Sequence, residues 1–209
     1  MISNKLRLWE AAAFFALGLS LMAGAWSSAS ADALSGQVLR LHVIANSDSQ
    51  EDQALKLQVR DGVLAQAGEL LEGISSQEEA EAVLTDHLEE LARTGADIVG
   101  QAGYDYPVSV SLEECWFPTR IYDTFSLPAG NYRALRVVIG AGEGQNWWCV
   151  VFPPLCLASV TEEVASTAAQ AGLSEDQVSL ITGRDGGYVV KFKLMEWWDS
   201  LIQALGLSR

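Results

Sequence analysis

The most regular pattern of apolar and polar residues begins at residue 39. Leu39, Leu41 and Val43 are apolar and alternate with the polar residues Arg40 and His42. Alternation with a period of two places successive side chains on opposite faces of a strand. We therefore expect a strand with one apolar face and one face that carries two polar side chains.

A helix is predicted directly after this strand. Ser49 and Asp52 have the spacing of a capping box, in which an N-cap residue and the residue three positions later bond each other's backbone. Apolar residues then recur at every fourth position along one helical face: Leu55, Val59, Val63 and Ala67. The turn between strand and helix contains Asn46, Ser47 and Asp48, whose side chains favour turns and caps. This polar turn is either a solvated helix cap or a recognition surface.

A second helix is predicted from residue 76 onward. Ser76 and Glu79 form another capping box, and we expect the helix to continue to a C-cap at Gly103. His87 falls on the apolar face of this helix, where we expect it to be partly buried.

Strands follow, at residues 106–112, 132–139 and 147–152. The Gly-rich residues 140–144 indicate a flexible hairpin turn, which would pair the last two strands with each other. The resulting order, βααβββ, predicts the α+β class, with a mostly antiparallel sheet backed by helices and followed by a helical C-terminal tail.

The two ends of the chain differ from this domain. Residues 1–31 carry Lys5 and Arg7 before an apolar run and small residues at 29–31, which is the layout of a secretory signal peptide or an N-terminal membrane anchor. We therefore expect export, with membrane contact only through this leader. The predicted signalling domain covers residues 32–156, and residues 157–209 form a helical extension. Its last helix places Trp197 and Trp198 on one face, to pack on the domain or to dock on a partner.

Charge excludes some partners. The 209-residue chain has a formal net charge of −14 at pH 7. Such an acidic surface repels nucleic acid and anionic lipid head groups. We expect no nucleic-acid partner.

The cysteines and histidines offer little chemistry. Of three cysteines, Cys149 and Cys156 flank a Pro-Pro reversal and could form a disulfide, which leaves Cys115. Neither cysteines nor histidines have the spacing of a zinc site, so we expect no metal and no cofactor. One catalytic trio can be written, Cys149 with His42 and Asp48, but apolar neighbours should raise the pKa of that thiol. We expect a protein that is not an enzyme and has no small-molecule substrate, with an exported Cys149/His42 hydrolase as the alternative.

Three stretches carry a family resemblance. RLHVIANSDSQEDQALKLQVRDGVL (40–64), FPTRIYDTFSLPAGNYRALRVVIG (117–140) and NWWCVVFPPLC (146–156) occur in this order. Together they resemble the stage II sporulation protein R family of endospore-forming bacteria. Cys115 and the long tail depart from the family pattern.

The resemblance implies a secreted signalling protein. Members of the family are made in the forespore and cross its membrane into the space between forespore and mother cell. There they trigger a membrane-embedded aspartic protease of the mother cell, which removes the pro-sequence of sigma-E. The resemblance thus implies an activating ligand rather than a protease. We place its contact surface at the ends of the first and last motifs, on these residues: His42, Asn46, Asp48, Arg60, Trp147 and Trp148.

Overall fold

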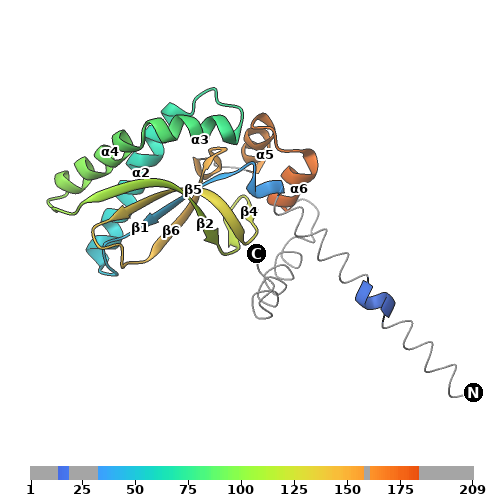
Figure 1. Ribbon diagram of the computed structural model, residues 1–209, viewed down its shortest axis with the longest axis horizontal. Coiled ribbons are helices and arrows are strands. Elements are labelled where there is room, and N and C mark those ends of the chain that lie inside the picture. The colour runs from blue at the N-terminus through green and yellow to red at the C-terminus, as the bar shows by residue number, and fades with distance from the viewer. Residues whose placement is uncertain (1–13, 19–32, 158–160, 184–209) are drawn as a thin grey trace, which may run out of the picture.

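The computed structural model of the protein describes residues 14–18, 33–157 and 161–183 (Figure 1). The predicted leader, apart from the helical residues 14–18, and the Trp-bearing helix of the tail lie outside these ranges. Among the helices within them, none is both long enough and apolar enough to cross a bilayer.

The described chain forms a four-stranded sheet with the strand order β2-β5-β1-β6. In that order the strands comprise Val108–Phe117, Gly130–Ile139, Leu39–Ile44 and Asn146–Phe152. β1 runs parallel to β5, whereas the two outer pairs are antiparallel. Three helices pack on one side of this sheet (Figure 1). The structure confirms the predicted α+β class.

The position of β1 corrects one prediction. β1 lies between β5 and β6, so those two strands do not pair with each other as the hairpin prediction required. Their connection instead crosses the end of β1, where the amides of Glu143 and Gly144 donate to the carbonyl oxygens of Asn46 (3.2 Å) and Ala45 (3.0 Å). The prediction is wrong because the sequence pattern of a turn cannot reveal that a third strand lies between the two strands that the turn connects.

The N-cap residues predicted from the sequence mark the starts of two helices. Ser49 caps α2 (Gln50–Leu70), and its Oγ accepts a hydrogen bond from the backbone amide of Asp52 at 3.1 Å, as the sequence predicts. The reciprocal half of the predicted capping box is not formed, because the amide of Ser49 donates to Ser47 Oγ instead. Ser76 likewise caps α3 (Gln77–Asp86). The predicted continuous helix is wrong, because the chain breaks at His87 and resumes as α4 (Leu88–Gln101).

The break at His87 has a local cause. The amide of His87 donates to the carbonyl of Leu84, only three residues back, and its Nδ1 lies 2.7 Å from the carbonyl oxygen of Val83. These contacts end α3. The new direction of α4 brings Leu91 and Val99 into the core beside the apolar stripe of α2.

Two hydrophobic clusters cover the two faces of the sheet. The helix-side cluster joins Leu39, Leu41 and Val43 of β1 to α2, α3 and α4. The arm-side cluster lies on the opposite face and includes Phe117 and Tyr132.

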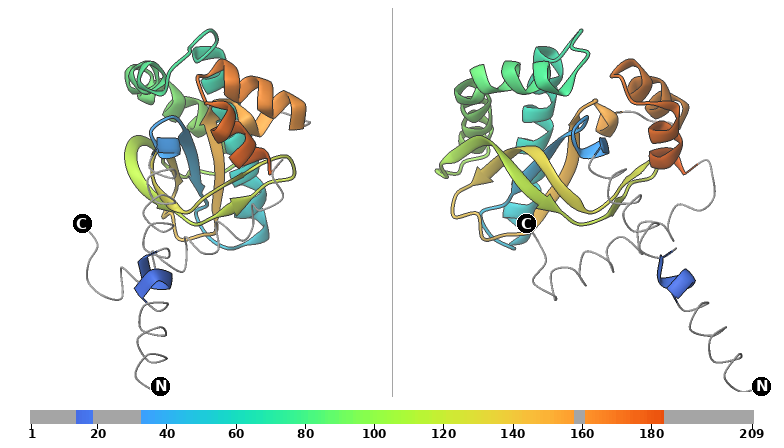
Figure 2. Two further views of the ribbon diagram at one scale, coloured as in Figure 1. Left: turned by 90° about the vertical axis from the view of Figure 1, so that its right-hand side faces the viewer. Right: turned by 45° about the vertical axis from the view of Figure 1, so that its right-hand side comes forward.

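Short elements enclose the arm-side cluster. β3 (Arg120–Ile121) and β4 (Ser126–Leu127) form a two-stranded arm inserted between β2 and β5. η1 (Leu155–Leu157), α5 (Thr161–Gln170) and α6 (Glu175–Thr182) follow β6. Their side chains share this cluster with the arm, and both views place α5 and α6 beside the end of the sheet that carries the arm (Figure 2).

Candidate functional site

The polar turn after β1 is an internally bonded junction. The carboxylate of Asp52 is 4% exposed and accepts hydrogen bonds from Ser47 Oγ (2.6 Å) and Asn46 Nδ2 (2.8 Å). The hydrogen bonds from Ser47 and then Asn46 lower the pKa of Asp52, because they stabilise its charged form. Asp52 therefore joins the helix cap to the end of β1.

The same turn holds the loop between β5 and β6. Asn46 Oδ1 accepts from the amide of Ala141 (2.9 Å), and Asp48 Oδ1 accepts from the amide of Gln145 (2.8 Å). Buried Lys56 donates from Nζ to the carbonyl of Gln145 (3.0 Å). Asn46 and Asp48, both predicted to bind a partner, are thus engaged in this internal contact.

Two glycines permit the close approach of loop and turn. Gly140 has a positive φ of 59°, and a Cβ there would overlap the side-chain amide of Asn46. A Cβ on Gly144 would overlap the backbone carbonyl of Ser47. The sequence predicts that the Gly-rich loop is flexible. In the structure this loop is instead hydrogen-bonded along its length to the polar turn after β1.

Arg40, on the polar face of β1, is completely buried. Its Cζ lies 4.1 Å from the centroid of the Phe117 ring and 4.9 Å from that of Tyr132. Its Nη2 donates to the hydroxyl of Tyr122 (3.0 Å), which donates in turn to the carbonyl of Trp148 (3.0 Å). Burial lowers the pKa of Arg40. Arg40 and Tyr122 therefore join the arm to the sheet.

His42, two residues further along, stacks on Trp148. The ring centroids are 4.0 Å apart with an interplanar angle of 18°, and Nε2 of His42 lies 2.7 Å from Oδ1 of Asn146. Burial lowers the pKa of His42 and outweighs the hydrogen bond to Asn146, so the imidazole is neutral at pH 7. Two of the predicted contact residues therefore form one stacked pair.

This pair extends into a row across the arm-side face of the sheet. In the strand register His42 of β1 pairs with Trp148 of β6 on one side and with Arg136 of β5 on the other. Arg136 Nη1 lies 3.2 Å from Oε1 of Glu113 on β2, and these two side chains are 37% and 43% exposed. We call Trp148, His42, Arg136 and Glu113 the cross-strand row. It places buried His42 and partly buried Trp148 beside an ion pair whose two side chains are accessible.

Arg60 and Trp147 lie on the opposite face of the sheet. The Cζ of Arg60 is 4.3 Å from the centroid of the Trp147 ring, and Arg60 Nη2 is 2.6 Å from Oδ1 of Asp61. The six predicted contact residues therefore occupy three places: the cross-strand row, this cation–aromatic pair, and the junction that contains Asn46 and Asp48.

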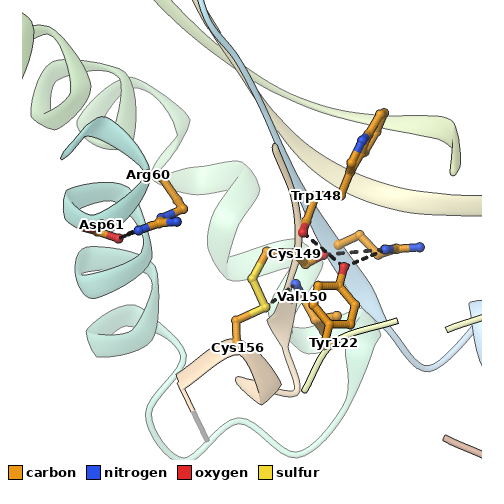
Figure 3. Close-up of a disulfide and its surroundings, with 8 residues drawn as sticks. Arg60, Asp61, Tyr122, Trp148, Cys149, Val150 and Cys156 are labelled. Carbon is orange, nitrogen blue, oxygen red and sulfur yellow. Dashed lines mark hydrogen bonds and ion pairs between the residues drawn. A yellow bond between two sulfur atoms is a disulfide. The ribbon is translucent and has the colours of Figure 1, made fainter. Parts of the chain in front are cut away.

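A disulfide joins Cys149 of β6 to Cys156 (Figure 3). Their Cα atoms are 6.2 Å apart. Cys149 belongs to the helix-side cluster, whereas His42 faces the arm side. The trio of the hydrolase alternative is not assembled, because Cys149 pairs in register with Leu41 rather than with His42. Residues adjacent along a strand point to opposite faces.

No metal centre is found within the described part of the chain, where no three His, Cys, Asp or Glu side chains are close enough to share an ion.

Sequence reasoning did not assign a role to Arg40, Tyr122, Arg136 or Glu113. Arg136 follows the period-two alternation of its strand, and this signal could have placed it on the same face as His42. Nothing local distinguishes Arg40, whose burial depends on aromatic residues more than 75 positions away.

Comparison with known proteins identifies the family. The family model for stage II sporulation protein R matches residues 35–162, more than half of the chain. The stage II sporulation protein R of Bacillus subtilis (strain 168) is 33% identical over 187 residues, which cover 79% of this chain and 81% of that protein. No solved structure matches the chain. The family match begins before β1 and runs through β6 to the start of α5, so it includes the cross-strand row and the junction. The chain therefore belongs to the stage II sporulation protein R family.

Proposed function

We propose that this protein is an exported signal of endospore formation that activates a membrane-embedded aspartic protease of the mother cell. In this proposal the protein leaves the forespore by its N-terminal leader and acts in the space between the two cells. The activated protease then removes the pro-sequence of sigma-E. Membership of the stage II sporulation protein R family and the leader pattern of residues 1–31 support this assignment.

The family match over residues 35–162 is the observation that carries the proposal. Cys149 is held in a disulfide and His42 is stacked against an indole, so these residues are suited to structure rather than to turnover. A protein of this kind acts by binding.

The disulfide supports the proposed location. Disulfides form and persist in oxidising compartments outside the cytosol. The Cys149–Cys156 bond closes a short loop at the end of β6 and lies against the helix-side cluster. Such a bond suits a protein that functions after export.

We place the contact surface on the cross-strand row. Trp148 is an aromatic anchor of the type that dominates the energetics of interfaces. Arg136 and Glu113 supply accessible charges of both signs beside it. Of the remaining predicted contact residues, Arg60 with Trp147 forms a second candidate patch, whereas Asn46 and Asp48 keep the adjoining loop in place.

The proposed mechanism is a shift of population. A ligand activates a protease only if it binds the active state, or the active dimer, more tightly than the inactive one. A tenfold rise in the active fraction requires a difference of about 1.4 kcal/mol between the two binding free energies. One well-packed aromatic anchor can supply a difference of this size.

Co-expression in a bacterium that does not sporulate tests the proposal. The protease and the sigma-E precursor are produced with the full chain, and the processed fraction is read from an immunoblot. We expect the full chain to raise processing at least about tenfold, and Trp148→Ala to remove most of this rise. Leu57→Ala, which truncates an exposed apolar side chain elsewhere, is the matched control. Equal processing with and without the full chain would exclude the proposal.

A further inference from the structure

The two outer strands of the sheet differ in how their edges are closed. Along β6 the outward carbonyl of Trp148 accepts the hydroxyl hydrogen bond of Tyr122 (3.0 Å), and the outward amide of Val150 donates to Sγ of Cys156 (3.0 Å) (Figure 3). The arm and the disulfide therefore cap this edge.

The edge of β2 has no such caps. β2 pairs with β5 from Val108 to Phe117, and the amide of Gly140 donates to the carbonyl of Pro107 (2.8 Å) in the same register. In an antiparallel ladder, hydrogen-bonded pairs alternate with pairs whose backbone groups point outward. Counted from the Pro107–Gly140 pair, the outward groups belong to these residues: Val108, Val110, Leu112, Glu114 and Trp116. Within the described chain, none of their outward amides or carbonyls has a hydrogen-bond partner beyond the sheet.

Most of the features that protect natural sheet edges are missing from this strand. Such edges are blocked by proline, by charged side chains (above all lysine), by bulges or by a short length, and of these β2 has only the carboxylates of Glu113 and Glu114. β2 is ten residues long, pairs without a register shift, and contains neither proline nor a basic residue. A regular edge of this length is a template for another strand.

The chemistry of the edge selects its partner. Glu113 and Glu114 occupy its centre, and Trp116 is 52% exposed at one end. A second copy of this chain would bring the same carboxylates together across the new pair, which is destabilising, and the net charge of −14 adds to the repulsion. A segment with Lys or Arg would instead place a cation against Glu114 and its aliphatic stem over Trp116.

We propose that the outer edge of β2 receives an extended, basic segment of a partner protein by strand addition. This inference rests on the proposed function, in which the partner is the membrane-embedded protease. The added strand lies beside Glu113 and so meets the accessible end of the cross-strand row. A depression beside the edge gives room for a long side chain of that strand, and it is lined by Ser35, Gly36, Gln77, Glu114, Asn131 and Arg133.

Two substitutions of Glu114 distinguish the contribution of its outward backbone amide from that of its carboxylate. Its side chain is exposed, so its replacement removes no core packing. Glu114→Pro removes the outward amide and blocks strand addition, whereas the matched variant Glu114→Ala keeps the amide and loses only the carboxylate. In the co-expression assay we expect Glu114→Pro to lower processing at least about tenfold and Glu114→Ala about two- to threefold. The midpoint temperature of thermal unfolding of each purified variant must match that of the native chain. If Glu114→Pro unfolds at a lower temperature, Trp116→Pro is used in its place.

Crosslinking identifies the occupant directly. The full chain is produced with photoreactive p-benzoylphenylalanine in place of Trp116 and irradiated in cells that contain the protease. A crosslink to the protease supports the inference, and peptide mapping should place it on a Lys- or Arg-bearing segment. A crosslinked dimer of this chain, a crosslink within the chain, or none at all would overturn it, whatever the processing assay shows. If the native chain raises processing and Glu114→Pro raises it equally, strand addition is wrong while the proposed function stands.

Discussion

The guanidinium group of Arg40 lies 4.1 Å from the centre of the Phe117 ring, and it makes no salt bridge to a carboxylate of the described chain. A fully buried cation without a counter-ion depends on its aromatic and hydrogen-bonding neighbours. The hydroxyl of Tyr122 is the main polar neighbour and also reaches the carbonyl of Trp148. The arm, the sheet and the edge of β6 are therefore joined at one phenol.

Removal of that phenol hydroxyl should destabilise the protein. In Tyr122→Phe, both Arg40 Nη2 and the carbonyl of Trp148 lose a partner in a partly buried setting. We expect the free energy of unfolding to fall by about 2 to 4 kcal/mol, measured by urea denaturation. Tyr104→Phe is the control, because no hydrogen bond of that hydroxyl is found in the described chain, and it should change stability by less than about 0.5 kcal/mol. Equal effects of the two substitutions would show that the Tyr122 contact is not stabilising.

Addition of a methyl group at Gly140 should disrupt the junction after β1. A Cβ there is strained at a φ of 59° and overlaps the side chain of Asn46. We expect Gly140→Ala to cost about 2 to 4 kcal/mol of unfolding free energy. Gly73→Ala is the matched control, since Gly73 also has a positive φ, of 81°, but faces open space. That variant should cost only the backbone strain of about 1 to 2 kcal/mol. A smaller loss for Gly140→Ala than for Gly73→Ala would contradict the close contact with Asn46.

Stability should depend on pH through His42. Burial lowers the pKa of His42 in the folded protein, so the unfolded chain binds more protons than the folded one between that lowered value and about 6.5. This contribution is fully present above pH about 6.5 and is lost as the pH falls through that window. Arg136, Glu113 and Arg40 are the charged groups that act on the ring.

Urea denaturation at pH about 7.5, 6.5 and 5.5 measures this dependence. His42→Gln should flatten the slope between the last two values. An unchanged slope in His42→Gln would show that burial does not hold His42 neutral.

The disulfide should behave as a single unit. Cys149→Ser and Cys156→Ser open the same loop, with a sequence separation of seven residues, so each should lower the unfolding free energy by about 2 to 3 kcal/mol. The double variant should be no less stable than either single one, because the residues act together. Cys115→Ser, which alters the cysteine that is outside the disulfide, should stay within about 1 kcal/mol of the native chain. Additive losses in the double variant would mean that the two sulfur atoms are not bonded to each other.

Local signals predict the local structure well. The alternation of Leu39, Leu41 and Val43 places these side chains in the helix-side cluster, and Ser49 caps α2 as expected. Both features depend on neighbours within a few residues, and such neighbours are visible in a sequence.

Features built by distant contacts were not predictable in the same way. The place of β1 between β5 and β6 depends on hydrogen bonds from the Gly-rich loop to Ala45 and Asn46, about 100 residues earlier. Alternation placed Arg40 on the polar face of its strand, but it could not reveal that the arm-side cluster buries this face at Arg40. The candidate site likewise has features that the sequence predicted and features that it could not predict. Sequence reasoning named Trp148 and His42 but could not reveal that they stack, nor that Arg136 and Glu113 continue their row.

The most direct measurement reconstitutes the signal from purified parts. The protease is placed in lipid vesicles with the sigma-E precursor supplied on its cytoplasmic side, and the purified full chain is added to the opposite side. The rate of precursor cleavage should rise at least about tenfold and saturate as the added chain fills its binding sites, with no effect when the chain is added on the precursor side. An unchanged rate at all concentrations, or cleavage of the precursor by the chain without the protease, would contradict the proposal that this protein acts as an activating ligand.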